Sequence, residues 1–372
     1  MKHPIIDQQA IDSVVEILHS GELSMFRGTP EGHNGGVWVQ RLEQSFRDYF
    51  GVKYAIAIQS ATAGLHASLL ALDIGNRDEV IVSPYTFVAS ASCVLMVGAK
   101  PVFVDIEPNF FCIDPKQVRK SITSRTRAII PVHLMGQPAD MRWLQTISDD
   151  YGLAIIEDSA QALGARHFRH LVGTMGDVGI FSFNQSKPVS SGEGGMVITN
   201  DDALNRNLRA LRNYGEVSDP ELKMVGYNWR LCEIEACLAY YQFQKIDEMN
   251  KHRQNLVQAF SEVIKGTALS VAPIRPGCSH VYYTTGIFFD KEKAGMTREE
   301  FQKRTLERGV YMGSGYVKPL YLLPVFGGKR GMCPVAERMY ESDLLVTDIF
   351  RYPMSLERAV GIGSICKEVL NG

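Results

Sequence analysis

The sequence predicts an α/β protein in which a large domain, with a mainly parallel sheet flanked by helices, precedes a smaller C-terminal α/β domain. Between residues 54 and 200, short apolar β-rich runs alternate with helical stretches, and the alternation then stops. Strands this apolar are covered on both faces, and strands separated by helices pair mainly in parallel. A length of 372 residues suits two domains. We place their boundary near residue 250, so the domains are 1–250 and 251–372.

The large domain begins with an N-terminal helix and a glycine-rich loop over residues 21–40. The run YAIAI predicts a strand at 54–58, and the small-residue stretch 60–72 predicts the helix that follows it. A second helix ends at Gly98. The same alternation predicts further strands at 79–83, 101–106, 127–134, 153–158, 178–183 and 195–200.

The small domain follows a long helical stretch at 233–266, where apolar residues recur every three or four positions. Its length favours a connector between the domains. The segments 281–290 and 297–309 and the C-terminal run from Leu356 fit a smaller α/β domain.

Composition and motifs exclude several classes of protein. Lys and Arg number 39 against 41 Asp and Glu, a net charge of −2, so no strong field attracts nucleic acid or acidic lipid. No apolar run reaches the ~20 residues that span a bilayer, and the acidic N-terminal stretch is no signal peptide. Seven scattered cysteines without a CxxC pair indicate reduced thiols, and hence a cytosolic protein with no membrane partner. The absence of GxGxxG, GxxxxGK[ST] and HExxH argues against dinucleotide, P-loop and zinc chemistry, and we expect no metal.

Three features at predicted strand ends point to one cofactor. Asp158 closes the apolar run LAIIED, Lys187 lies in the loop after VGIFSF, and residues 60–64 place hydroxyls at a helix N-terminus, which attracts phosphate. An acid, a lysine and a phosphate site are what pyridoxal 5'-phosphate (PLP) requires. Each has a plainer interpretation: Asp158 could cap a helix at 159–165, Ser60 and Thr62 could be ordinary caps, and Lys187 a surface lysine.

Nearly the whole chain resembles the DegT/DnrJ/EryC1/StrS aminotransferases, which are fold-type I PLP enzymes acting mostly on nucleotide-linked keto-sugars. The resemblance rests on SATAGLHASLLAL, SPYTFVASAS, PVFVDI, PVHLMGQPADM, IIEDSAQALGA, GDVGIFSFNQSKPVSSGEGGMV and GYNWRLCEIEA, in the family's order and spacing. It implies an enzyme that moves an amino group from glutamate or glutamine to a nucleotide-linked keto-deoxysugar. It also implies a homodimer with shared active sites.

The resemblance assigns roles residue by residue. Lys187 resembles the lysine that forms the Schiff base with PLP, Asp158 the partner of the pyridinium nitrogen, and Gln161 the residue that contacts the ring or its O3′. The remaining cofactor contacts are Thr62 and Ala63 in the phosphate-binding turn, Ser182 as a second phosphate ligand, Phe87 stacked on the ring, and Asn228 reaching into the neighbouring subunit's phosphate site.

The segment 316–324 (YVKPLYLLP) is expected near the substrate, with Tyr316 and Lys318 as candidate contacts. Here the sequence departs from the family's pattern. Tyr321 and Tyr214 stand where histidine is common, and Pro188 follows the lysine directly. Because all three are expected near the substrate, the family's sugar does not carry over to this chain.

Two alternatives stay open beside the sugar aminotransferase. One is an aminocyclitol transaminase or an aminohydroxybenzoate-type synthase, which keeps the same lysine and changes the substrate pocket. The other is a non-enzymatic PLP-binding regulator, against which the intact Lys187, Asp158 and Gln161 argue. Lys187 also argues against the branch of the family that has histidine there and performs dehydration.

Overall fold

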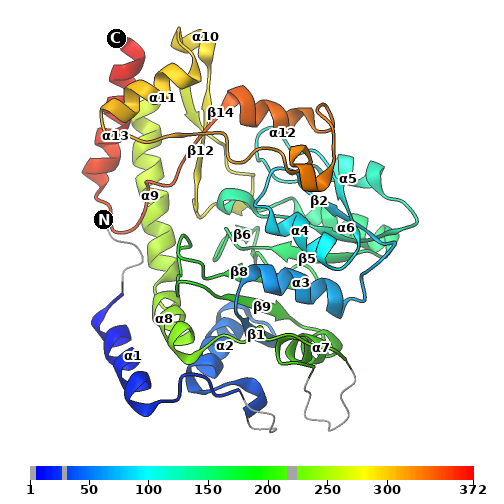
Figure 1. Ribbon diagram of the computed structural model, residues 1–372. Helices are drawn as coiled ribbons and strands as arrows, with labels where there is room; N and C mark the ends of the chain where they lie inside the picture. Colours follow the sequence, from blue (N-terminus) through cyan, green and yellow to red (C-terminus); the bar gives the residue numbers. More distant parts are fainter. Residues whose placement is uncertain (1–5, 27–31, 216–223) are drawn as a thin grey trace.

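A computed structural model describes residues 6–26, 32–215 and 224–372. Its centre is a seven-stranded sheet in the order β1-β9-β8-β5-β4-β2-β3 (Figure 1). All strands run parallel except β9, which is antiparallel to both of its neighbours. The predicted mainly parallel sheet is therefore confirmed. The strands are β1 (Tyr54–Ile58), β2 (Glu79–Val82), β3 (Lys100–Phe103), β4 (Thr126–Ile130), β5 (Ala154–Asp158), β8 (Val178–Ser182) and β9 (Gly195–Thr199).

Helices cover both faces of this sheet (Figure 1). One face packs against α3 (Ala61–Ala71), α4 (Ala89–Met96) and α7 (Asp202–Arg212). The other face is covered in two parts: over β2, β4 and β5 lie α5 (Pro115–Ser121) and α6 (Met141–Tyr151), and over β1, β9 and β8 lie α2 (Val37–Phe50) and α8 (Glu233–Phe243).

The N-terminal segment corrects one expectation. Helix α1 spans Gln8–Ser20, but the predicted loop 21–40 holds a 3-10 turn at Gly32–Asn34 and the start of α2, while residues 27–31 lie outside the described part. Glu233 accepts hydrogen bonds from Gly36 N at 3.1 Å and Trp38 N at 2.8 Å. A distant carboxylate therefore caps α2, and local sequence carries no signal of it.

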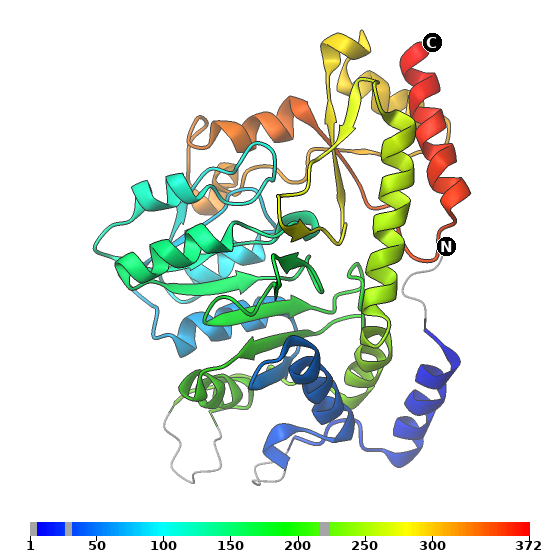
Figure 2. The same cartoon turned by 180° about the vertical axis from the view of Figure 1, so that it is seen from behind.

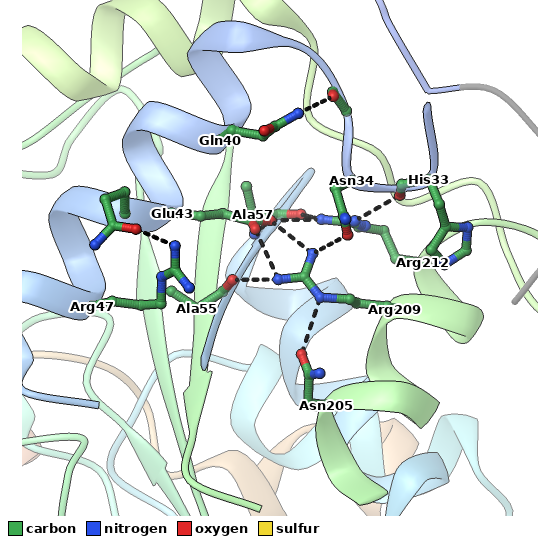
Figure 3. Close-up of polar contacts among 12 residues, drawn as sticks. His33, Asn34, Gln40, Glu43, Arg47, Ala55, Ala57, Asn205, Arg209 and Arg212 are labelled. Atoms are coloured by element: carbon green, nitrogen blue, oxygen red, sulfur yellow. Dashed lines mark hydrogen bonds and ion pairs between the residues drawn. The ribbon is translucent and has the colours of Figure 1, made fainter. Parts of the chain in front are cut away.

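A buried ion cluster fastens this segment to the sheet (Figure 3). Glu43 of α2 pairs with Arg209 at 2.8 Å and Arg212 at 2.9 Å, both on α7, and accepts a hydrogen bond from Ala57 N at 2.9 Å. Burial opposes ionisation of Glu43, but the two guanidinium groups outweigh it and lower its pKa. Arg212 also donates to Ala57 O at 3.0 Å. The cluster thus fixes the last turn of α7 to the end of β1, close to the phosphate-binding turn predicted at residues 60–64.

The stretch 233–266 forms two helices, α8 and α9 (Ile246–Ile264), rather than the single one expected. Phe243, Ile246 and Met249 are buried at three-residue spacing across the break. The apolar periodicity therefore continues where the helix does not. Figure 2 shows α9 (yellow-green) running from the large sheet to the second domain beside α13 (Leu356–Asn371).

The second domain is a four-stranded antiparallel sheet, β10-β12-β14-β13, packed on α9, α11 and α13. The segment 281–290 contains β12, and the segment 297–309 contains α11. The elements are β10 (Leu269–Val271), β12 (Thr285–Phe289), β13 (Gly313–Ser314), β14 (Leu344–Thr347), α10 (Lys291–Ala294), α11 (Arg298–Glu307) and α12 (Pro334–Arg338).

A small third sheet was not predicted. In it β11 (Cys278–Ser279) pairs with the hairpin of β6 (Arg166–His167) and β7 (His170–Leu171). Two-residue strands carry no periodic signal in a sequence. As expected, five of the seven cysteines are buried, and all seven are free thiols. Within the described part of the chain, no helix combines the length and apolar character needed to cross a membrane.

Candidate active site

The C-terminal ends of three parallel strands of the large sheet, the neighbours β5 and β8 and the edge strand β1, form one pocket. Asp158 ends β5, Ser182 ends β8, and Ser60 follows β1. The pocket has a volume of about 320 Å³. Ligands of open parallel sheets bind at this edge. The lining residues are Ser60, Ala61, Thr62, Leu65, Phe87, Ala89, Ser90, Asp158, Ala160, Gln161, Ser182, Asn184, Ser186, Lys187, Glu193, Tyr283 and Tyr316.

The turn after β1 forms one wall. Ser60 is the N-cap of α3, and its Oγ accepts a hydrogen bond from Ala63 N at 3.1 Å. The N–H groups of such a first turn point out of the helix and favour an anion. Gly195, of the GEGG run, lies so close that a Cβ there would stand 2.7 Å from both Ala61 N and the carbonyl carbon of Ser60. Glycine at 195 is therefore what lets β9 approach the turn.

Asp158 is 5% exposed and held from two sides. Ser90 Oγ donates to its Oδ2 at 2.7 Å, and Ala160 N donates to its Oδ1 at 3.2 Å. Residues 159–165 form turns, so the alternative in which Asp158 caps a helix there is wrong. The carboxylate is held by a turn and by a serine from α4, which leaves it at the wall of the pocket.

Gln161 joins both domains at the pocket. Its Oε1 accepts from Met135 N at 2.8 Å, and its Nε2 donates to the Tyr316 hydroxyl at 2.9 Å. Tyr316 in turn donates its backbone N–H to the Tyr85 hydroxyl at 2.8 Å. Burial raises the pKa of Tyr316, so its phenol stays protonated at neutral pH. Gln161 is thereby held in one orientation.

Lys187 lies in a tight loop after β8. Its backbone N–H donates to Asn184 O at 2.8 Å, and its Nζ lies 4.1 Å from the centroid of the Tyr283 ring. Asn184 Nδ2 donates to Glu193 Oε1 at 3.0 Å, which ties this loop to the GEGG run. The loop presents the ammonium group to the pocket beside an aromatic face.

Seven of the predicted site residues line this pocket together: Thr62, Phe87, Asp158, Gln161, Ser182, Lys187 and Tyr316. Phe87 is 59% exposed, and its ring lies at the pocket. Three others do not line it. Ala63 is buried behind the turn, and Asn228 and Lys318 are exposed outside it.

Asn228 is exposed, in a segment that hydrogen bonds join to other parts of the large domain. It forms an isolated bridge with Asn213, and its Oδ1 accepts from Arg230 Nε at 2.8 Å. Beside it, Trp229 O accepts from Gln59 N at 2.9 Å, next to the turn that follows β1. The N-cap of α8 is Cys232, so Asn228 does not cap that helix.

The substrate segment 316–324 only partly meets its expectation. Tyr321 is fully buried and hydrogen-bonds Glu337, and Cys333 N donates to its hydroxyl at 3.2 Å. It therefore packs in the core between the domains and does not line the pocket. Tyr214 is exposed, with Arg230 stacked 5.0 Å from its ring centroid.

Sequence reasoning missed several residues of the pocket. Ser90 lies in the motif SPYTFVASAS, three residues after Phe87. In a helix, residues three apart lie on the same face, so this spacing could have indicated that Ser90 also faces the site. Tyr283 comes from the small domain, and nothing local to its sequence marks it. Asn184, Ser186 and Glu193 surround Lys187 within its own loop.

Comparison with known proteins shows the family of the chain. The sequence matches the DegT/DnrJ/EryC1/StrS aminotransferase family over residues 4–348. The chain belongs to this family. It is thus a PLP-dependent aminotransferase by family, and the confirmed fold is the one its family resemblance implied.

Three relatives illustrate the range of the family. The spore coat polysaccharide biosynthesis protein SpsC of Bacillus subtilis is 31% identical over 358 residues, 92% of this chain and 90% of SpsC. A pleiotropic regulatory protein of Geobacillus stearothermophilus is 37% identical over 310 residues, 82% of each chain. The crystal structure of DesV from S. venezuelae has a TM-score of 0.89 and 30% identity, covering 98% of this chain and 95% of DesV.

The residues of the pocket fit PLP. A buried carboxyl group, Asp158, lines the pocket and is held by Ser90, so it could meet a protonated ring nitrogen. The start of α3 and the hydroxyls of Thr62 and Ser182 suit a phosphate. Lys187 and the exposed ring of Phe87 line the same pocket and suit the aldehyde and the ring face of the cofactor.

Proposed function

We propose that this aminotransferase moves an amino group from glutamate or glutamine to a nucleotide-linked keto-deoxysugar, with PLP held in the pocket described above. The observation that carries the proposal is that Lys187, Asp158, Gln161 and the start of α3 line one pocket. Bound there, PLP supplies an electron sink for the bonds of the amino carbon.

The chain's own residues would bind and orient that group. The first turn of α3, with Thr62 and Ala63, and the Ser182 hydroxyl would hold its phosphate, and Phe87 would cover one face of the ring and exclude water. Asp158 would keep a proton on the ring nitrogen, because a buried carboxylate favours a cationic partner. Gln161 would donate to the ring's O3′.

In the absence of substrate, Lys187 would be bonded to the cofactor. Once the amino donor had displaced it, Lys187 would act as the base and acid that moves a proton. Its Nζ is the basic nitrogen that lines the pocket from the loop after β8. A base in this position works best when its ammonium and amine forms are both accessible near neutral pH. The contact with the Tyr283 ring supports that location for the amine.

Two further parts belong to the proposal. We infer a homodimer in which Asn228 serves the partner's phosphate site, because its side chain is exposed and its segment is hydrogen-bonded beside Gln59. We also infer that Tyr316 contacts the sugar and that the exposed Lys318, two residues on, meets the nucleotide's phosphates.

A substrate panel tests the proposal. The purified enzyme is first converted by glutamate or glutamine to its aminated form, and the return of the cofactor's visible absorbance is then followed with nucleotide-linked keto-hexoses and with keto-cyclitols. We expect the keto-hexoses alone to be aminated, and Lys187→Ala to be inactive with both. Turnover of a keto-cyclitol without turnover of any nucleotide-linked sugar would reject the substrate class.

A further inference from the structure

Tyr283 reaches the large domain's pocket from the small domain. Its segment is fastened to the 131–139 loop, where Val281 N donates to Gly136 O at 3.1 Å and Thr284 N donates to Met135 O at 3.3 Å. Met135 is also the residue that holds Gln161. The position of Tyr283 is therefore set by the same loop that orients the pocket.

The Tyr283 side chain contacts the Lys187 loop twice. The Nζ of Lys187 lies 4.1 Å from the ring centroid, and the phenolic oxygen lies 3.0 Å from Ser186 Oγ. Ser186 is itself held, because its hydroxyl and its backbone N–H both lie 3.1 Å from Asn184 Oδ1. The phenol thus stands against the reacting amine in one fixed orientation.

The charged groups that act on this phenol are cations. Lys187 faces it from the loop after β8, Arg253 from α9 and Arg351 from the segment after β14, while Tyr316 is a neutral phenol. Arg253 is 3% exposed, and its Nε and Nη1 have no hydrogen-bond partner among the residues that the structure describes. Arg351 is paired with Asp348.

These cations change the ionisation of the phenol. Burial raises the pKa of Tyr283, but the positive charge of Lys187, the Ser186 hydrogen bond and Arg351 outweigh it, so the pKa lies below its usual value. The phenolate form is thus stabilised beside the ammonium group.

We propose that Tyr283 is a positioning residue for Lys187. Its ring face holds the side-chain nitrogen of Lys187, and its hydroxyl, bonded to Ser186, fixes the ring to the same loop. Without the hydroxyl, the ring and the Lys187 nitrogen beside it would lose this fixed position. The inference rests on the proposed function only in taking Lys187 as the reacting group.

The test is a phenolate titration of the full chain without cofactor, followed by near-ultraviolet absorbance. Subtracting the absorbance titration of Tyr283→Phe from that of wild type leaves the ionisation of Tyr283 alone. Tyr282→Phe, which removes the hydroxyl one residue away, is the matched control. We expect Tyr283 to ionise at a pH below the ordinary tyrosine pKa of about 10. When the same subtraction is made with Lys187→Met in both proteins, we expect this ionisation to shift to higher pH. An isolated transition that is unchanged by Lys187→Met overturns the proposal.

Kinetics supply a second readout. Tyr283→Phe keeps the ring and removes only the hydroxyl that ties it to Ser186, so we expect kcat to fall by about tenfold or more with KM nearly unchanged, as for loss of orientation of the reacting group. Tyr282→Phe should keep the wild-type kcat. Because the titration needs neither substrate nor cofactor, its result does not depend on whether the substrate is a keto-sugar. An unchanged kcat in a Tyr283→Phe protein of wild-type circular dichroism contradicts the proposal.

Discussion

The hydroxyl of Ser90 donates a 2.7 Å hydrogen bond to Oδ2 of Asp158, and both side chains are buried. Ser90 is held in turn by Thr86, whose Oγ1 lies 3.2 Å from its Oγ. A hydrogen bond to a charged group in such a site is worth about 1.5–3 kcal/mol. The carboxylate at the end of β5 is therefore oriented from α4 as well as by its own turn.

Asp158→Asn should keep the cofactor yet slow the reaction. The amide removes the charge that keeps a proton on the ring nitrogen while preserving the shape of the side chain. We expect kcat to fall by at least about tenfold, or about 1.4 kcal/mol of barrier, measured by steady-state transamination with the bound cofactor quantified. A smaller loss would reassign Asp158 to holding the turn at Ala160.

Ser90→Ala should slow the enzyme less than Asp158→Asn does. The carboxylate keeps its charge and its bond to Ala160 N but loses the oriented donor. We expect a loss of up to about tenfold in kcat. Ser92→Ala, a half-buried serine on the same helix, is the control and should keep wild-type rates. Equal losses of kcat in Ser90→Ala and Ser92→Ala would rule out a specific role for Ser90.

Mixed dimers test the role of Asn228. A Lys187→Ala subunit combined with an inactivating Asn228 variant should rebuild one site, with Lys187 from one chain and Asn228 from the other. Random mixing should give roughly a quarter of wild-type activity, since half of the dimers are hybrids with one intact site of two. Activity no higher than that of the parents, with hybrids verified by mass, would remove Asn228 from the site.

Glu43→Gln should destabilise the protein strongly. Arg212 is fully buried, and the change leaves its charge without its partner, so we expect a loss of about 3–5 kcal/mol. The free energy of unfolding is measured in urea, with the exposed Glu16→Gln as control. A loss no larger than that of the control would show that the cluster is not needed for stability.

The same residue predicts a pH dependence. The pKa of Glu43 is lower in the folded protein than the ordinary value of about 4.3. Its contribution to stability is therefore complete above the unfolded pKa and is lost as the pH falls through the folded pKa. In Glu43→Gln, the acid side of the stability profile should be flatter than in wild type. Parallel acid limbs for the two proteins would contradict this.

The sequence predicted what periodicity and strand ends encode. The strands of the large sheet, and the convergence of Asp158, Lys187 and the turn at Thr62, all follow from apolar runs that end in polar residues at one sheet edge. It could not predict contacts made across long separations. Glu233 capping α2 and Tyr283 meeting Lys187 depend on how the domains pack, and neither has a local pattern.

Two other expectations differ from the structure, because the local sequence allows more than one conformation or environment for the residue. Asp158 was weighed as a helix cap because small residues follow it, yet those residues form turns. Tyr321 was expected near the substrate because it replaces a histidine common in the family, but it is buried and bonds Glu337.

The central claim is that Lys187 carries the cofactor, and one measurement tests it most directly. The enzyme as purified is treated with borohydride, which converts an imine between PLP and a lysine into a stable amine, and its peptides are analysed by mass spectrometry. The account predicts a pyridoxyl-phosphate adduct on Lys187, together with loss of both adduct and turnover in Lys187→Ala. An adduct on another lysine, or normal transamination by Lys187→Ala, would contradict it.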